Sequence, residues 1–293
     1  MRQCTGVFNK KDSHWVGDGF PVSTVFSHQI AGAAASPFLL LDHAGPYDFK
    51  PKLGGYCGAG PHPHKGYEAV TIVYDGEVGY RDETGVAGLI GAGDVQWMTA
   101  GAGVIHEEYP SPDFSRRGGM LEMVQLWVNL PARNKSEPAA YQNITRDMIP
   151  VVRRDGMDVR VIAGSFDGTK GPARTFTSIN VWDVKLAAGH RAELPVPASH
   201  NVSIVLLRGN LRMADVEFTD GTTVMLGAGG DAVEFEACSD AVLLILSGEP
   251  IAEPVVACGP FVMNSEKEIR QAIVEFGAGR FANIETETAR SNL

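Results

Sequence analysis

Two short segments of the chain place histidines and a carboxylate at alternate positions, which is a spacing that can hold a metal ion. The first segment reads His-Pro-His and contains His62 and His64, and the second reads His-Glu-Glu and contains His106 and Glu108. Residues two apart in an extended strand point to the same face. The spacing therefore predicts that His62 and His64 project together, that His106 and Glu108 project together, and that Glu107 points away.

Three imidazoles and one carboxylate form a donor set for a divalent transition metal, because neutral imidazole binds Zn, Cu, Fe and Ni well. Such a set leaves one net positive charge on the ion. In an octahedron it also leaves two positions open, for a chelating substrate or for one substrate atom and O2. A single histidine is usually unrelated to metal, but two spaced pairs beside glycine-rich turns favour a site. We expect the two pairs to converge from opposing walls of one barrel.

The elements that must position these residues are predicted to be strands. The 34 glycines and 17 prolines separate short apolar runs, which is typical of an all-β chain with many turns. In the first half the runs are Ala69–Tyr74, Val86–Ile90, Val95–Thr99, Val104–Tyr109 and Leu121–Leu130. No helical period lies between them, so a sandwich or barrel is expected.

The second half repeats this rhythm after a polar, proline-containing connector over residues 131–150. Its runs are Val159–Ala163, Phe176–Leu186, Val202–Leu207, Leu211–Met213, Thr223–Leu226, Ala232–Phe235 and Ala241–Ser247. We predict two tandem barrels, one over residues 1–133 and one over residues 134–293. A capping box of Ser265 and Glu268 predicts a C-terminal helix over residues 265–276, with Gly277 as the left-handed residue that ends it.

Composition narrows the possible partners. The formal net charge of the 293 residues is −10, and no basic stripe is present, which argues against direct binding of nucleic acid and of anionic membranes. The four cysteines are dispersed and form no C-x-x-C pair. The start of the chain lacks the apolar core of a signal peptide, and no apolar run approaches the ~20 residues that span a bilayer. We expect a cytoplasmic protein.

The segments that carry the metal spacing resemble a known family. The stretch GPHPHKGYEAVTIVYDG, residues 60–76, resembles the first cupin motif, and GAGDVQWMTAGAGVIHEEY, residues 91–109, looks like the second motif as pirins carry it. Similar matches follow at VGDGFPV (16–22), PFLLLDH (37–43), VQLWVNLP (124–131) and GPFVMN (259–264). The resemblance covers nearly the whole chain and implies two tandem cupin barrels with a metal, usually iron, in the first barrel only.

By this resemblance the ligands are His62, His64, His106 and Glu108, and the ion is expected to be one Fe(II) per chain, with Mn, Ni, Co and Cu as alternatives. Glu68 occupies the position of a ligand in many cupins. Because it lies four residues after His64, alternation also aims it inward. We expect Glu68 to orient the metal ligands or to act as a general base near the open positions, rather than to be a ligand itself.

Three further residues qualify this picture. Human-type pirins have arginine where this chain has Lys65, which we expect near the mouth of the site and which bears on partner contacts. Gln125 lies on a strand near the site and is a candidate for the cavity wall. The second barrel contains His200 in its strand pattern but no H-x-H pair, so we expect it to be free of metal.

The resemblance implies two alternative functions. In the first, the protein is a dioxygenase like quercetin 2,3-dioxygenase. A flavonol would bind the metal through its 3-hydroxyl and 4-carbonyl oxygens, Glu68 or Glu108 would take the hydroxyl proton, and O2 would open the heterocycle with loss of carbon monoxide. In the second, the protein is a metal-dependent protein-binding module, such as a transcriptional co-regulator, that turns over no substrate.

Overall fold

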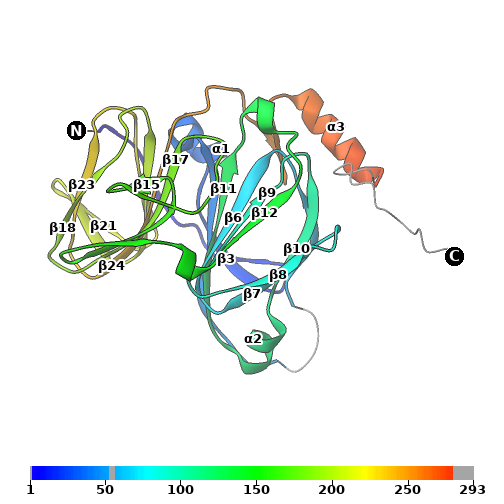
Figure 1. Ribbon diagram of the computed structural model, residues 1–293, viewed down its shortest axis with the longest axis horizontal. Helices are drawn as coiled ribbons and strands as arrows, with labels where there is room; N and C mark the ends of the chain where they lie inside the picture. The colour runs from blue at the N-terminus through cyan, green and yellow to red at the C-terminus, as the bar shows by residue number, and fades with distance from the viewer. Residues whose placement is uncertain (1, 53–56, 280–293) are drawn as a thin grey trace.

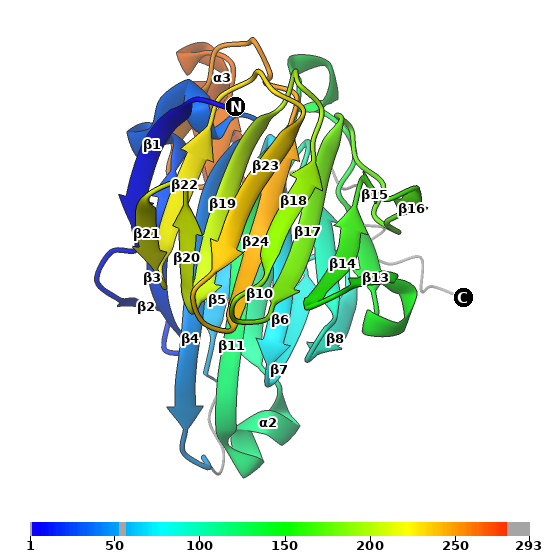
Figure 2. The same ribbon diagram turned by 90° about the vertical axis from the view of Figure 1, so that its left-hand side faces the viewer.

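The computed structural model describes residues 2–52 and 57–279, which form two β-barrels that lie side by side (Figures 1 and 2). Each barrel is built from a seven-stranded sheet and a four-stranded sheet. The all-β, two-barrel fold with a C-terminal helix that the sequence predicts is therefore confirmed.

The seven-stranded sheet of the first barrel has the order β12-β9-β6-β11-β4-β3-β2, and its four-stranded sheet has the order β5-β10-β7-β8. The strands of the larger sheet, in that order, are Ala140–Ile144, Val95–Thr99, Tyr67–Asp75, Gly119–Asn129, Phe38–Phe49, Phe20–Ser27 and His14–Val16. Those of the smaller sheet are Ala59–His64, Val104–Pro110, Glu77–Asp82 and Ala87–Gly91.

The second barrel has the same composition of sheets, in the orders β1-β22-β19-β24-β17-β14-β13 and β18-β23-β20-β21. The strands of its larger sheet are Cys4–Asn9, Thr222–Leu226, Asn201–Arg208, Ala241–Gly248, Ile179–Leu186, Met157–Ala163 and Val151–Arg154. Those of its smaller sheet are Arg191–Pro195, Ala232–Ala237, Asn210–Met213 and Val216–Thr219.

Short elements complete the fold. They are β15 Ser165–Phe166, β16 Thr169–Lys170, β25 Val256–Cys258, β26 Phe261–Met263, α1 His28–Ala31, α2 Pro112–Arg117, α3 Glu266–Gly277 and the 3-10 turns η1 Gly32–Ala35, η2 Ala132–Asn134 and η3 Arg146–Met148. Over the described ranges, no helix has both the length and the apolar character needed to cross a membrane.

The central strands of the first barrel are buried on both faces, which explains their nearly continuous apolar sequences. On β6, Val70 and Ile72 join a large hydrophobic core whose other members include Val181 and Leu246 of the second barrel. Val73, on the opposite face, packs inside the first barrel. Because alternate residues of a strand point to opposite faces, β6 contributes one face to the contact between barrels and one face to the interior of its own barrel.

The strand pairing crosses the domain boundary expected after residue 133. Strand β1, near the start of the chain, pairs with β22 of the second barrel, where Val7 lies opposite Val224. Strand β12, which follows residue 133, pairs with β9 of the first barrel. Each sheet is thus completed partly by a segment from the other side of the boundary. The division into residues 1–133 and 134–293 stays a prediction.

The C-terminal helix begins where the capping box predicts and ends later than expected. The Ser265 hydroxyl accepts a hydrogen bond from the Glu268 amide, and α3 then runs to Gly277. Gly277 is itself helical, and the left-handed glycine is Gly279, at φ +66°. The expected position of the cap was therefore wrong by two residues. Ile269, which is buried, packs α3 against β25 and β26.

Candidate metal centre

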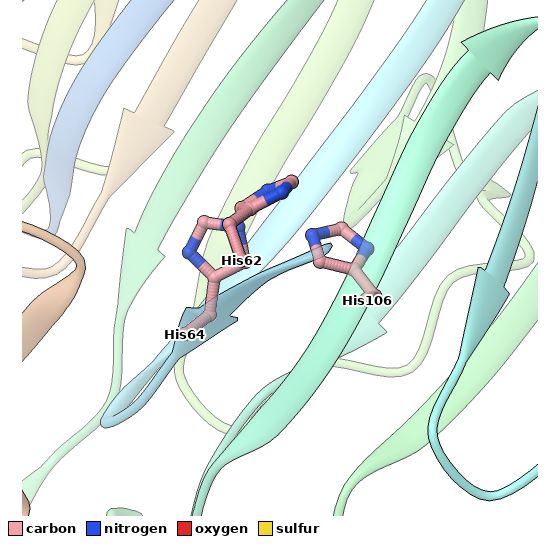
Figure 3. Close-up of side chains that lie close together, drawn as sticks. All are labelled: His62, His64 and His106. Carbon is pink, nitrogen blue, oxygen red and sulfur yellow. The ribbon is translucent and has the colours of Figure 1, made fainter. Parts of the chain in front are cut away.

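The three predicted histidines meet inside the first barrel. His62 and His64 lie on β5 and His106 lies on β10, and their ligand atoms are all within 4.8 Å of one another. Figure 3 shows the three rings close together, with His106 facing His62 and His64. The ring centroids are 4.5 Å apart for His62 and His106 and 4.8 Å apart for the other two pairs. The three histidines that sequence spacing selected are thus brought together by the fold.

The two histidine-bearing strands are neighbours in one sheet. β5 and β10 are paired antiparallel, with His106 directly opposite His62. The expectation that the pairs converge from opposing walls was therefore wrong. Directly paired residues of an antiparallel ladder point to the same face and approach closely, so this pairing alone aims His62 and His106 at one point.

The ring nitrogens are suited to a metal because several of them are buried without partners. His64 Nε2 and both nitrogens of His106 have no hydrogen-bond partner among the residues that the structure describes. The third ring is oriented by its neighbour, since His62 Nδ1 lies 2.8 Å from the Gly60 carbonyl oxygen. If Nδ1 carries the proton and donates to that oxygen, His62 Nε2 keeps its lone pair. Buried polar atoms of this kind need a partner, and a metal ion supplies one.

The protonation state also fits a metal. Burial, together with the charges of His106 and His62, lowers the pKa of His64 well below its usual value. Burial lowers the pKa of His106 to about 4, with a smaller opposing effect from Glu108. Both rings are therefore neutral near pH 7, and a metal binds the neutral form without displacing a proton.

An aromatic pair holds His64 in place. The Tyr67 hydroxyl is hydrogen-bonded to His64 Nδ1, and the Tyr67 ring stacks on Trp127 at a centroid distance of 4.3 Å. Trp127 also packs against His64 edge to face, with their centroids 5.5 Å apart. Hydrogen bonding at Nδ1 leaves Nε2 of His64 for the metal, which is how outer residues commonly orient histidine ligands.

Glu108 lines the same cavity as His62 and is held by two side chains. Its Oε1 accepts a hydrogen bond of 3.2 Å from the Thr71 hydroxyl, and its Oε2 accepts one of 2.8 Å from the Gln125 amide. Gln125 is in turn oriented by Trp127, whose Nε1 donates to Gln125 Oε1 at 3.3 Å. The carboxylate is not among the atoms within 4.8 Å of one another, so its role as fourth ligand stays a prediction.

Glu107 lies on the other side of β10, as alternation predicts. It is paired with Arg81 of β7, and it is not among the residues that line the cavity of His62 and Glu108.

Glu68 does not point into the metal cavity, contrary to expectation. It lies opposite Thr99 of β9 and Val128 of β11, on the face of β6 that packs toward the second barrel. Thr99 donates a hydrogen bond of 2.9 Å to Glu68 Oε1. Burial raises the pKa of Glu68 to about 7, partly offset by its hydrogen bonds. From this face of β6, Glu68 cannot act as a general base at the metal site.

The alternation argument failed for Glu68 because His64 and Glu68 belong to different sheets. β5 ends at His64 in the four-stranded sheet, and β6 begins at Tyr67 in the seven-stranded sheet. Between them Gly66 has a φ of +89°, a conformation that glycine adopts readily. A turn between sheets does not preserve which side of a strand is the inside.

Lys65 contacts both a neighbouring turn and the C-terminal helix. Its Nζ donates to the Ala102 carbonyl oxygen at 2.5 Å and lies 3.3 Å from Glu275 Oε2 on α3. With 15% of its side chain exposed, it ties the C-terminal helix to the turn after His64. The residue therefore supports the ligand segment, and its expected place near the mouth of the site stays a prediction.

The cavity beside His62 has a volume of about 50 Å³ and is lined mostly by apolar side chains. Its lining residues are Val16, Phe20, Val22, Asp42, Ala44, Ala59, His62, Glu108, Met123 and Gln125. Gln125, a candidate from the sequence, is confirmed as part of this wall. Asp42, Thr71, Tyr67 and Trp127 were missed, because only the pairing of β4, β6 and β11 reveals that they share the inner face.

The second barrel fills the corresponding strands with apolar residues. Strands β18 and β23 begin its four-stranded sheet as β5 and β10 begin the other. Leu194 lies opposite Val233 there, and Ala192 opposite Phe235, all within one hydrophobic cluster. His200 lies elsewhere, with its ring nitrogens 3.3 Å from the hydroxyls of Ser178 and Ser247.

Comparisons with known proteins agree with this arrangement. Residues 19–128 match the Pirin family, and residues 181–282 match the Pirin C-terminal cupin domain. A protein of Pseudomonas aeruginosa named "Putative quercetin 2,3-dioxygenase" is 49% identical, over 96% of this chain and 99% of its own. A pirin-like protein of Caulobacter vibrioides is 42% identical, over 84% of this chain and 87% of its own.

Two solved structures extend the comparison. A quercetin 2,3-dioxygenase from Acinetobacter baumannii superposes with a TM-score of 0.93 at 46% identity, and the alignment covers 96% of this chain and 98% of that one. A bacterial pirin of Escherichia coli in complex with nickel(II) superposes with a TM-score of 0.64 at 20% identity, over 84% of this chain and 100% of that one. The second likeness shows the cupin fold alone.

Proposed function

The chain belongs to the pirin family, and on this premise we propose that it is a metal-dependent dioxygenase that cleaves flavonols. The observation that carries the proposal is the convergence of three imidazoles, two of them with buried nitrogens that lack a partner among the described residues. One of the three, His62, lines a cavity together with the anchored carboxylate of Glu108. The names of the relatives supply the substrate class, since both the Pseudomonas protein and the Acinetobacter structure are named for quercetin.

The metal would be held by His62, His64, His106 and Glu108. The imidazoles already converge, and Glu108 would join them by turning its carboxylate away from Thr71 or Gln125. Fe(II) is our expectation for the ion, and Mn, Ni, Co and Cu accept the same donors. When bound, the metal would act as a Lewis acid and a template for the substrate oxygens.

The cavity limits how a flavonol can be seated. A volume of about 50 Å³ accommodates only one or two waters, at roughly 30 Å³ each, whereas whole ligand pockets measure roughly 300–1,000 Å³. We propose that only the edge bearing the 3-hydroxyl and 4-carbonyl enters between the histidines and the wall of Phe20 and Met123. The remaining rings would lie outside, and the apolar wall would exclude water from the reacting carbons.

Glu108 is the group that would receive the proton of the 3-hydroxyl, because Glu68 lies on the other face of the sheet. Thr71 and Gln125 each donate to one carboxylate oxygen. After Glu108 turns toward the metal, the hydrogen bond that it keeps would position the carboxylate as the proton acceptor. In the balanced reaction both atoms of O2 enter the ring-opened ester, and one ring carbon leaves as carbon monoxide.

The test begins with metal content. Protein purified without a metal-affinity tag should contain about one transition-metal ion per chain by mass spectrometry, and quercetin should then drive O2 uptake. His106→Ala should lose both the metal and the uptake. His190→Ala, a half-exposed histidine of the second barrel, is the matched control and should keep both.

Two results would overturn the proposal. O2 uptake that persists in His106→Ala would show that the metal site does not carry the reaction. A full complement of metal without uptake on any flavonol would favour the alternative, a metal-dependent protein-binding module. The cytoplasmic location stays a prediction in either case.

A further inference from the structure

Asp42 lies at the centre of the inner wall of the first barrel. On β4 it is paired with Thr24 of β3 on one side and with Gln125 of β11 on the other. Residues that are directly opposite in an antiparallel pair share a face. The Asp42 side chain therefore lies beside the Gln125 amide that holds Glu108, and it lines the same cavity as His62 and Glu108.

One oxygen of this carboxyl has no partner. Asp42 Oδ1 is buried and accepts no hydrogen bond from any residue that the structure describes. Burial raises the pKa of Asp42, and a hydrogen bond from Thr24 opposes this effect only in part. Buried acceptors in native proteins are nearly always satisfied, so the missing partner of Asp42 Oδ1 needs an explanation.

Asp183 of the second barrel is also a buried carboxylate, but its oxygens have hydrogen-bond partners. Asp183, which is 1% exposed, accepts a hydrogen bond of 2.7 Å from Arg160 Nη1 and also contacts the Tyr74 hydroxyl. Within residues 2–52 and 57–279, Asp42 forms no such ion pair, and its cavity is lined otherwise by apolar groups and the metal-site residues. His14 lowers the pKa of Asp42 by a smaller effect than burial raises it, but it does not bond to Oδ1, which has no hydrogen-bond partner among the described residues. This oxygen can therefore accept a hydrogen bond from a bound ligand.

We propose that Asp42 is a substrate-recognition residue: its carboxyl accepts a hydrogen bond from a phenolic hydroxyl next to the oxygens that the substrate presents to the metal. This inference rests on the proposed function and deepens it. It makes the substrate class a polyhydroxylated flavonol, because a flavonol with only the chelating pair would leave Asp42 Oδ1 unsatisfied. Sites that hydrogen-bond a substrate hydroxyl discriminate strongly against analogues that lack it.

The experiment measures binding, so it does not depend on turnover. Metal-loaded protein is titrated without oxygen with two probes, 3-hydroxyflavone, which carries only the chelating pair, and quercetin, which carries further hydroxyls. Absorbance gives each dissociation constant, and metal content is measured for every variant. The variants are Asp42→Leu, Asp42→Asn and Thr24→Val. The last is the matched control, since it removes the supporting hydroxyl and leaves the carboxyl.

Wild-type protein should bind quercetin at least about tenfold more tightly than 3-hydroxyflavone, as expected for one hydrogen bond to a carboxylate. Asp42→Leu should lose this preference while its affinity for 3-hydroxyflavone stays within about twofold. Asp42→Asn, which keeps an acceptor oxygen, should retain part of the preference. Thr24→Val should retain most of it, and all variants should keep the metal.

Each other outcome has a definite meaning. An unchanged preference in Asp42→Leu overturns the inference and leaves the proposed function standing. If Asp42→Leu does not fold, an unchanged preference in Asp42→Asn overturns it instead. Loss of metal in either Asp42 variant overturns it by making Asp42 a ligand. If wild-type protein binds neither probe, the proposed function fails and the inference fails with it.

Discussion

The two barrels use the same pair of strands for opposite purposes. β5 and β10 of the first barrel and β18 and β23 of the second hold matching places in their four-stranded sheets. In the first barrel these strands carry a cluster of imidazoles and Glu108. In the second they carry apolar residues that are at most 4% exposed: Ala192, Leu194, Val233 and Phe235.

The difference shows where each barrel obtains its stability. Burying a side chain such as Leu or Phe stabilises a fold by about 1.5–3 kcal/mol. A buried polar atom without a partner costs about 1–3 kcal/mol, and His106 alone has two such nitrogens. The second barrel is thus stabilised by its own contents, whereas the first keeps a destabilising cluster that a ligand can satisfy.

The largest expected effect is on the free energy of unfolding, when the buried ring of Phe235 in the second barrel is removed. Phe235→Ala should lower the free energy of unfolding by about 3–5 kcal/mol, because it removes a buried aromatic ring and leaves a cavity. Glu234→Ala, the exposed neighbour on the same strand, should change it by less than about 0.5 kcal/mol. Urea denaturation of the metal-free protein measures both, and similar values for the two variants would contradict the comparison.

The pH dependence of stability tests whether Glu68 is buried on the face of β6 that packs toward the second barrel. Its pKa is raised to about 7 in the folded protein, from about 4.5 in its unperturbed state, so the folded state binds more protons between these values. The contribution of Glu68 to stability is therefore present at low pH and lost as pH rises through 7.

Glu68→Gln should consequently match wild type near pH 4 and exceed it by about 3 kcal/mol at pH 8. Denaturation across this range checks the difference. The variant should keep its metal and its O2 uptake, since Glu68 does not reach the cavity. A loss of uptake with normal metal content would restore Glu68 as the general base.

Gln125 tests whether metal binding at the candidate site of the first barrel depends on residues that hold the ligands in place. Gln125→Leu removes the amide that donates to Glu108 Oε2 and should weaken metal binding by about tenfold to a hundredfold, or about 1.4–2.7 kcal/mol. The control is Gln96→Leu, because the buried Gln96 amide nitrogen has no hydrogen-bond partner in the described chain. Competition with a metal chelator gives both affinities, and equal losses would count against a specific role for Gln125.

The smallest expected effect is that of His106→Leu, which puts an apolar side chain into the first barrel, as the second barrel has on its matching strands. His106→Leu replaces two unpartnered nitrogens by an apolar side chain and should stabilise the metal-free protein by about 1 kcal/mol, at the cost of metal binding. His62→Leu is the control, because His62 is less buried and its Nδ1 contacts the Gly60 carbonyl oxygen. Thermal unfolding of the metal-free variants is the measurement, and a large loss of stability in His106→Leu would show that the histidine has a structural role.

Sequence spacing was sufficient for features that depend on neighbouring residues. That His62 and His64 share a face, and that Glu107 and Glu108 lie on opposite faces, follows from the alternation within a single strand. The helix start at Ser265 follows from the capping box, which involves only residues three apart. These relations are local, so they hold whatever the strand packs against, and the three histidines could be selected before any fold was known.

Relations between strands required the tertiary structure. The sequence does not show that β5 pairs with β10, that Asp42 lies opposite Gln125, or that β1 completes the second barrel. Glu68 illustrates the reason most directly. Alternation carries no information across the turn at Gly66, where the chain leaves one sheet for another, and only the pairing with Val128 decides which side is the inside. The sequence by itself thus selected the three histidines that converge, and the packing of the sheets determined what surrounds them.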